Sequence, residues 1–161
     1  MTMSVSFKKP DLYDEWVDDY EIFDNLYDAV IFMAVLGYVE DSVERENFRG
    51  SKGGVGQGNI RIESFYSDDI YRVIGGCLAY QDTEDPDALV DTELQAETIS
   101  KYATGGLEVA QEEFGAIPGN PADAIVNYIE AHEERPETGK KSILTKIREN
   151  FDNEMLNDDT D

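Results

Sequence analysis

The sequence predicts a mainly α fold, a compact bundle of about five helices with a glycine-rich loop and a short extended segment near residues 60–65. Three observations support this prediction. The chain has 161 residues, which is enough for one core that buries roughly 70% of the unfolded surface. Hydrophobic residues make up 40% of it, unlike a disordered chain. Most of them recur with helical spacing, and residues 60–65 alternate as a strand does.

The composition divides the chain into four segments. We expect a flexible N-terminus over residues 1–10, a helical domain over 11–134, a hinge and last helix over 135–150, and a disordered acidic tail over 151–161.

A central helix is predicted from the segment DDYEIFDNLYDAVIFMAVLGY. Its apolar residues recur every four positions and become continuous near its end, which is typical of a helix buried on all sides. Asp18 and Asp19 favour its start, because carboxylates stabilise a helix N-terminus, and Gly37 favours its end.

The later helices are bounded by residues that favour helix ends. Ser67 is expected to cap one helix, and Thr92 opens a long helix that ends near Phe114. Asn120 caps the next, with Pro121 at its first position.

Glycine pairs interrupt two of these helices. Each glycine costs about 1 kcal/mol relative to alanine inside a helix, so close approach of another element is the expected compensation. We predict such an approach at Gly75 and Gly76 and, in the long helix, a contact with another helix or a partner protein. That candidate contact comprises Tyr102, Gly105, Gly106 and Leu107.

Residues 51–59, SKGGVGQGN, match a nucleotide-binding P-loop only up to its decisive positions. Gln57 stands where the phosphate-binding lysine belongs, and Gly58 stands where the Mg²⁺-binding hydroxyl belongs. No apolar strand precedes the loop and no helical pattern follows it. We therefore predict a connector, and no nucleotide or other cofactor.

Positive charge is concentrated around this loop. Between residues 44 and 61 there are four cations, opposed there only by Glu44 and Glu46. The candidate DNA or phosphate contacts are Arg45, Arg49, Lys52 and Arg61. Glycine amides would let a phosphate backbone approach them. The alternative, which the chain's many carboxylates favour, is that these cations form ion pairs within the protein.

The overall charge is strongly negative: 36 acidic and 13 basic residues give −23 at pH 7. One interpretation is a partner-specific acidic surface, such as a DNA mimic. The other is a halophilic cytoplasm, where a carboxylate-rich surface stays soluble in concentrated salt. The acids are spread from Asp11 to Asp161, which favours the halophilic interpretation.

Residues suited to catalysis are sparse. The single cysteine, Cys77, lies in the apolar stretch VIGGCLAY and is expected to be buried. The single histidine, His132, is expected on an exposed helix surface. Pairs of acidic residues such as Asp24 and Asp28 are weak evidence for a metal site, because acidic residues are frequent throughout this chain. We predict no metal site, and the balance favours a protein that is not an enzyme.

Neither a signal peptide nor a membrane helix is predicted. The start MTMSVSFKKP has no apolar core, and the longest apolar run, residues 29–36, is too short to cross a bilayer. We expect a cytoplasmic protein without membrane contact.

Four short motifs occur in a characteristic order. They are AxLGY at residues 34–38, a loop with glycine and lysine at 51–58, IR-x-x-x-F at 60–65 and YA-x-GGLE at 102–108. In this order they resemble the DNA phosphorothioation-associated protein 4 family, encoded with Dnd-type DNA sulfur-modification and restriction systems. The resemblance covers roughly residues 20–130 and leaves residues 139–161 outside.

The resemblance implies a cytoplasmic accessory protein of phosphorothioation-linked restriction, an antiviral defence, and implies no particular reaction. With the sparse catalytic residues, it leads us to expect a non-enzymatic interaction protein. It would act through co-encoded proteins, with phosphorothioated DNA within a complex as a further candidate partner. Two alternatives stay open. An acidic DNA-mimic inhibitor or regulator would gather its carboxylates on one face, and an acidic metal-dependent nuclease or hydrolase subunit would cleave with Mg²⁺ or Mn²⁺.

We predict that salt stabilises the fold, because screening weakens the repulsion among the 36 acidic side chains. Thermal unfolding from about 0.1 to about 3 M KCl, a range over which the Debye length shrinks severalfold, should show a rising midpoint. A midpoint that stays flat or falls would contradict the halophilic interpretation.

Overall fold

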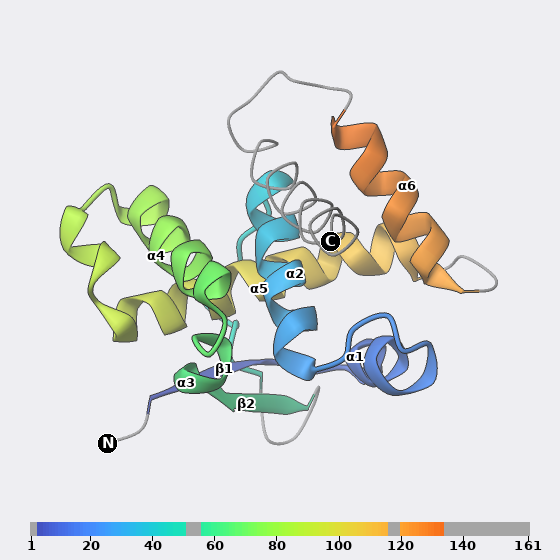
Figure 1. Cartoon of the computed structure of the whole chain (residues 1–161), viewed down its shortest axis with the longest axis horizontal. Helices are drawn as coiled ribbons and strands as arrows, with labels where there is room; N and C mark the ends of the chain where they lie inside the picture. Colours follow the sequence, from blue (N-terminus) through green and yellow to red (C-terminus); the bar gives the residue numbers. More distant parts are fainter. Residues whose placement is uncertain (1–2, 51–55, 116–119, 134–161) are drawn as a thin grey trace, which may run out of the picture. The chain divides into compact units, whose positions relative to one another are not determined.

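The computed structural model describes residues 3–50, 56–115 and 120–133, and these are mainly helical with one two-stranded sheet (Figure 1). This confirms the predicted fold class. The elements are β1 (Ser4–Lys8), α1 (Asp11–Asp14), the π-helix η1 (Glu15–Asp19), α2 (Leu26–Val39), β2 (Gln57–Arg61), α3 (Ile62–Phe65), α4 (Asp69–Thr83), the 3₁₀-helix η2 (Pro86–Leu89), α5 (Thr92–Phe114) and α6 (Pro121–Glu133). The predicted last helix and acidic tail lie outside the described residues.

The chain divides into two compact units, with the boundary between Ala116 and Ile117. The first unit contains β1 through α5, and α6 belongs to the second. The sequence predicts one helical domain over residues 11–134, which would include α6, and this stays a prediction. Within α6, the Asn120 side chain accepts a hydrogen bond from the Ala122 amide at 2.9 Å, and Pro121 occupies the first helical position.

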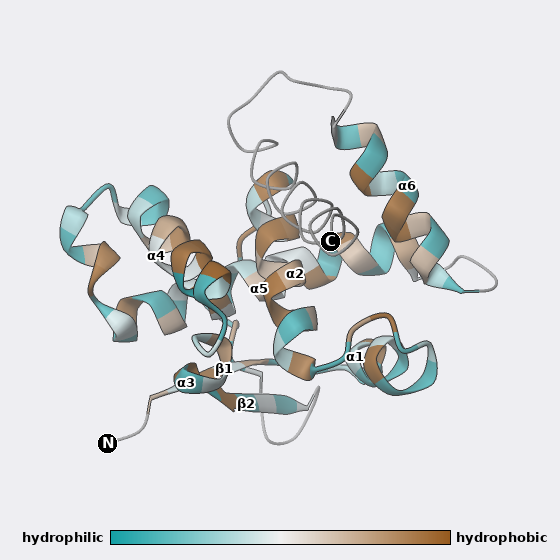
Figure 2. Ribbon diagram, viewed as in Figure 1, coloured by the Kyte–Doolittle hydropathy of each residue, from teal (hydrophilic) through white to brown (hydrophobic). Residues whose placement is uncertain are grey.

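Helix α2 crosses α5 at the centre of the first unit (Figure 1). From Ala29 to Tyr38, every α2 residue except Phe32 is buried, as the continuous apolar run predicts. The hydrophobic colouring of this helix is clear in Figure 2. Helix α5 has the predicted bounds and buries one face along its length. The core of the first unit is therefore built on this pair of helices.

Two glycines of α5 lie where the backbones of the two helices meet. A Cβ on Gly106 would overlap the carbonyl oxygen of Met33 in α2. A Cβ on Gly105 would overlap the carbonyl of Ser42, in the segment that follows α2. Because backbone atoms block both positions, only glycine fits at this contact.

Gly37 lies inside α2, so its prediction as the helix end was wrong. The helix continues to Val39, and a Cβ on Gly37 would overlap the carbonyl oxygen of Tyr102 in α5. Packing therefore requires this glycine. The helix ends where Asp41 adopts a left-handed conformation with a φ of 53°.

Helix α2 also begins later than predicted, at Leu26 instead of near Asp18 and Asp19. Those two aspartates belong to η1, and Glu21 then has a φ of 51°, which interrupts a right-handed helix. The start of α2 is set by a capping box, in which the Asn25 amide donates to the Asp28 carboxylate at 3.1 Å.

The N-terminal segment, for which the sequence predicts a flexible conformation, contains strand β1. It pairs antiparallel with β2, from Ser4 opposite Arg61 to Lys8 opposite Gln57. The alternating side chains of Val5 and Phe7 are fully buried, which ties the strand to the core. The predicted extended segment near 60–65 is strand only to residue 61, because Ile62–Phe65 forms α3.

Helix α4 departs from prediction at three points. Its cap is Asp68, whose carboxylate accepts a hydrogen bond from the Ile70 amide at 3.1 Å, instead of Ser67. Gly75 makes room for the Tyr66 side chain and not for another helix. Cys77 is exposed, so the expectation of a buried thiol was wrong.

We predict that Gly106→Ala destabilises the protein by about 1–3 kcal/mol, and Gly106→Leu by more, because either side chain forces α5 away from the Met33 carbonyl. Gly76→Ala is the matched control in α4. Its Cβ would meet its nearest neighbours at 3.8 Å, so the change should be neutral or stabilising by up to about 1 kcal/mol. Chemical unfolding measures both. Equal free energies of unfolding for the two alanine variants would contradict the close contact.

Candidate functional site

Two of the four candidate cations, Arg45 and Arg49, lie on a segment that is fixed along α5. The Glu44 amide donates to the Lys101 carbonyl at 3.1 Å, and the Thr104 hydroxyl donates to the Phe48 carbonyl at 3.0 Å. Phe48 is buried, with 5% of its surface exposed. Residues 44–48 therefore have defined positions, although they belong to no helix or strand.

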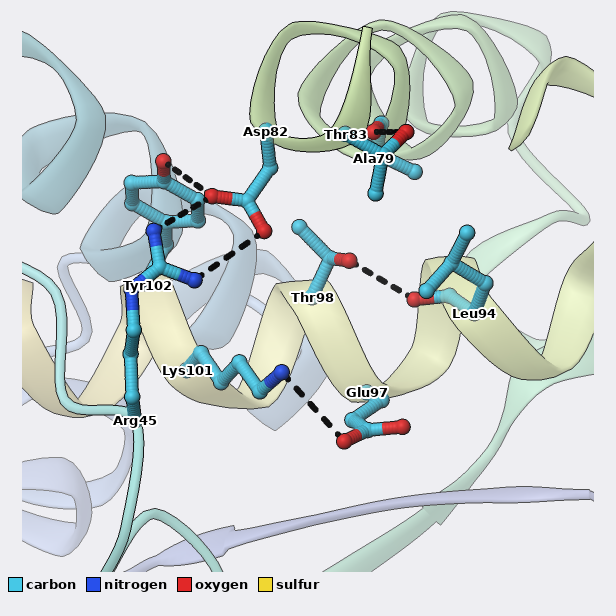
Figure 3. A network of polar contacts seen from close by, with 9 residues as sticks. All are labelled: Arg45, Ala79, Asp82, Thr83, Leu94, Glu97, Thr98, Lys101 and Tyr102. Atoms are coloured by element: carbon cyan, nitrogen blue, oxygen red, sulfur yellow. Dashed lines mark hydrogen bonds and ion pairs between the residues drawn. The ribbon is translucent and has the colours of Figure 1, made fainter. Parts of the chain in front are cut away.

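Arg45 is used within the protein, in an ion pair with Asp82 of α4 (Figure 3). Its two terminal nitrogens donate to the two carboxylate oxygens at 2.7 and 3.2 Å. The Tyr102 hydroxyl of α5 donates to the same carboxylate at 3.0 Å. The pair joins three parts of the fold, so for Arg45 the internal ion pair expected from the acidic composition is present.

The partners of Asp82 hold it as an anion. Its side chain is only 8% exposed, and the hydrogen bonds from the Arg45 guanidinium lower its pKa below the usual value against the opposing effect of burial. Burial, with the Asp82 carboxylate adding to it, raises the pKa of Tyr102 to about 12. Tyr102 is thus a neutral donor near pH 7, and the carboxylate is neutralised locally by Arg45.

Arg49 has a different environment. Its guanidinium lies 4.6 Å from the centre of the Phe48 ring, and the Lys101 ammonium lies 5.5 Å from the same ring. Both contacts fall within the range of a cation–π interaction. The Lys8 backbone passes beside Gly50, since its Cα lies 3.4 Å from the position of a Cβ on Gly50. Two positive charges, those of Arg49 and Lys101, therefore meet at Phe48 from separate parts of the chain.

The other two predicted cations are not part of this group. Lys52 lies outside the described residues. Arg61 lies at the opposite end of β2 from Gln57, which pairs with Lys8. Gln57 and Arg61 are four residue steps apart along the strand, which corresponds to about 13 Å. The sequence did not indicate Lys101 as a neighbour of Arg49, because the two residues lie 52 positions apart and come close only through folding.

The glycine-rich loop begins and ends beside β1. Gly50 adopts a left-handed conformation with a φ of 78°, and the Gly56 carbonyl accepts a hydrogen bond from the Lys9 amide at 2.8 Å. Strand β2 directly follows the loop. In a P-loop the strand precedes the loop and a helix follows, so the order here is incompatible with that motif.

Gly58, which stands in the hydroxyl position of the P-loop pattern, has a packing role. It is buried, and a Cβ there would overlap the ring of Phe7 on the paired strand. The ring of Phe7 in turn packs edge-on against Tyr13 at 5.4 Å.

The remaining predicted residues lie as follows. Tyr102 and Leu107, proposed with Gly105 and Gly106 as a packing or partner contact, are buried within the first unit. The His132 ring nitrogen Nδ1 lies 2.9 Å from the Tyr128 carbonyl in α6, and the side chain is half-buried.

Among the described residues, no three His, Cys, Asp or Glu side chains are grouped to hold a metal ion. No described helix is long and apolar enough to cross a membrane.

We predict that Asp82→Asn lowers the free energy of unfolding by about 1–2 kcal/mol at pH 7, since charge-assisted hydrogen bonds to Arg45 are lost. A lowered carboxyl pKa stabilises the fold above the unfolded pKa of about 3.9 and loses this effect as the pH falls through the folded pKa. The difference from wild type should therefore shrink below about pH 4. Glu112→Gln, at an exposed position of α5, is the control. An undiminished difference at pH 3 would assign the effect to packing.

Comparison with known proteins assigns the chain to a family. No significant match to a curated protein or to a solved structure was found. The family model described as DNA sulphur modification system-associated protein 4 matches residues 6–147, which is most of the chain. The chain therefore belongs to the family of DNA sulphur modification system-associated protein 4.

Proposed function

We propose that this protein is a non-enzymatic accessory component of DNA phosphorothioation-linked restriction, an antiviral defence, and that it acts in the cytoplasm by joining co-encoded proteins to DNA. The family supports the association with a DNA sulphur modification system. The observation that carries the proposed contact to DNA is the pair of cations, Arg49 and Lys101, at the Phe48 ring, at the base of the glycine-rich loop.

Arg49 is the best placed of these cations for a phosphate. Its side chain is exposed, and stacking on Phe48 restricts it without using its hydrogen-bond donors. Among the described residues it forms no ion pair, whereas Arg45 is paired with Asp82 and Lys101 with Glu97 at 3.3 Å. A guanidinium with free donors can make two parallel hydrogen bonds to one phosphate.

Long-range attraction cannot drive this contact. The whole chain carries −23 and repels DNA, and salt weakens phosphate contacts further. Binding must therefore depend on short-range charge-assisted hydrogen bonds within an assembly, in which a partner protein supplies most of the affinity. This explains why an acidic protein would need a local group of cations to reach DNA.

We predict that Arg49→Glu/Lys52→Glu weakens DNA binding by the assembled complex roughly a hundredfold, which corresponds to about 3 kcal/mol for two lost charge-assisted contacts. Binding of phosphorothioated and plain duplexes is measured for the protein alone and with the co-encoded proteins. Protection of cells against phage is measured in parallel.

Lys140→Glu/Lys141→Glu provides the charge-matched control. It also replaces two cations with glutamates, so the net charge changes by the same amount at another place in the chain. Equal loss in both variants would assign the effect to overall charge. Full binding and full protection by Arg49→Glu/Lys52→Glu would leave the loop as a connector only. Cleavage of DNA by the pure protein with Mg²⁺ or Mn²⁺ would replace the accessory role with that of a nuclease.

A further inference from the structure

Exposed apolar side chains are concentrated on one part of the first unit. Seven large hydrophobic residues are exposed among the described residues, and four of them fall between residues 73 and 90. Their exposed fractions are 62% for Val73, 37% for Tyr80, 52% for Leu89 and 83% for Val90. Single exposed apolar residues need no explanation, but a group drawn from two consecutive elements does.

These four side chains belong to one surface. Positions 73, 76 and 80 share a face of α4, because they are spaced three and four residues apart. Leu89 of η2 lies over that face, since its Cδ2 is 3.8 Å from the position of a Cβ on Gly76. Leu89 and Val90 then line a cavity of about 450 Å³ together with Tyr66 and Arg72. We call Val73, Tyr80, Leu89, Val90 and this cavity the α4–η2 face.

The α4–η2 face is held in place by buried hydrogen bonds. The Gln95 side chain of α5 is 4% exposed, and its amide nitrogen donates to the Ala88 carbonyl at 2.8 Å. Its amide oxygen accepts from the Tyr66 hydroxyl at 2.5 Å. Asp85 caps the first turn of η2 through the Asp87 amide at 3.0 Å. Leu89 and Val90 are thus presented to solvent by an ordered segment, which lowers the entropy cost of binding.

The charge around the face has one sign. Five exposed carboxylates lie in the cavity lining or on the chain segments that carry the face, and one guanidinium, that of Arg72, lines the cavity, so these six groups carry a formal charge of −4. The carboxylates are those of Glu63, Asp69, Asp85, Asp87 and Asp91. A second copy of this chain or a nucleic acid would be repelled, whereas a cationic partner would be attracted.

We infer that the α4–η2 face is the docking site for a protein segment that presents apolar side chains flanked by lysine or arginine. Apolar anchors would cover Val73, Leu89 and Val90 and enter the cavity, while the flanking cations would face the surrounding carboxylates. Such an arrangement of an apolar centre and a polar rim is typical of protein interfaces. This deepens the proposed function and rests on it, because it gives the protein partner a defined chemistry.

The test uses the full chain and a displayed library of random peptides of about 12 residues, selected on wild type alone. The recovered peptides should combine apolar residues with a net positive charge. Their Kd should rise at least tenfold on Val73→Ser/Val90→Ser, and severalfold on Glu63→Gln/Asp87→Asn. An environment-sensitive dye on Cys77, the single cysteine and an exposed residue of α4, reports binding near this face.

Matched controls separate the face from general surface effects. Val126→Ser replaces another exposed helix valine, 51% exposed on α6, and Glu112→Gln/Glu113→Gln removes two exposed carboxylates from α5. Neither should change the Kd more than twofold. Unfolding midpoints show whether each variant is folded. No enrichment, neutral or acidic peptides, or equal Kd values for Val73→Ser/Val90→Ser and wild type would overturn the inference. A wild-type dimer that this variant dissociates would also overturn it, in favour of a second copy.

Assembly with the co-encoded proteins distinguishes this inference from the proposed function. If those proteins bind wild type and Val73→Ser/Val90→Ser equally, the proposed function stands and the α4–η2 face is not the docking site. If they bind neither while the face still selects basic apolar peptides, the docking chemistry stands and the proposed association fails.

Discussion

The backbone contact between α2 and α5 determines the positions of most other elements in the first unit. Because Gly105 and Gly106 have no side chains, the carbonyls of Met33 and Ser42 can touch α5 directly. The Ser42 hydroxyl then donates to the Gly105 carbonyl at 2.9 Å, which fixes the direction in which the chain leaves α2. The following segment runs along α5 and reaches Lys101 and Thr104. The ion pair of Arg45 and the stacking of Arg49 are consequences of this contact.

The same arrangement separates two surfaces of opposite character. Two cations, Arg49 and Lys101, meet at Phe48, where the segment after α2 lies against α5. Carboxylates and exposed apolar side chains gather on the α4–η2 face. Asp82 and Arg45 bridge α4 to the segment of Phe48, and their charges cancel locally. Under the proposed function each surface would hold one partner, and the acidic composition would leave the cationic surface as the place for DNA.

Local patterns in the sequence were sufficient to predict the long elements but not their contacts. Helix α5 was predicted with its observed bounds because many positions carry the helical period. Helix α2 was also located, but its start was predicted near Asp18 and Asp19, before the observed start at Leu26. Strand β1 was missed because five residues give a weak signal and its paired residues lie 49 to 57 positions away. Gly37 was misassigned because a glycine that ends a helix and one that permits close packing look alike in sequence. The meeting of Arg49 and Lys101 at Phe48 depends on long-range contacts, so no local charge count could have predicted it.

The glycine-rich stretch illustrates how a steric requirement can imitate a nucleotide-binding motif. Gly50 has a left-handed φ that most side chains disfavour, and Gly58 lies under the Phe7 ring, where a Cβ would overlap it. Both glycines are explained by the pairing of β1 with β2 and by the core beneath it. These glycines therefore provide no argument for a bound phosphate. The argument for one has to come from charged side chains, and Arg49 is the cation next to the loop that the structure leaves exposed and without an ion pair among the described residues.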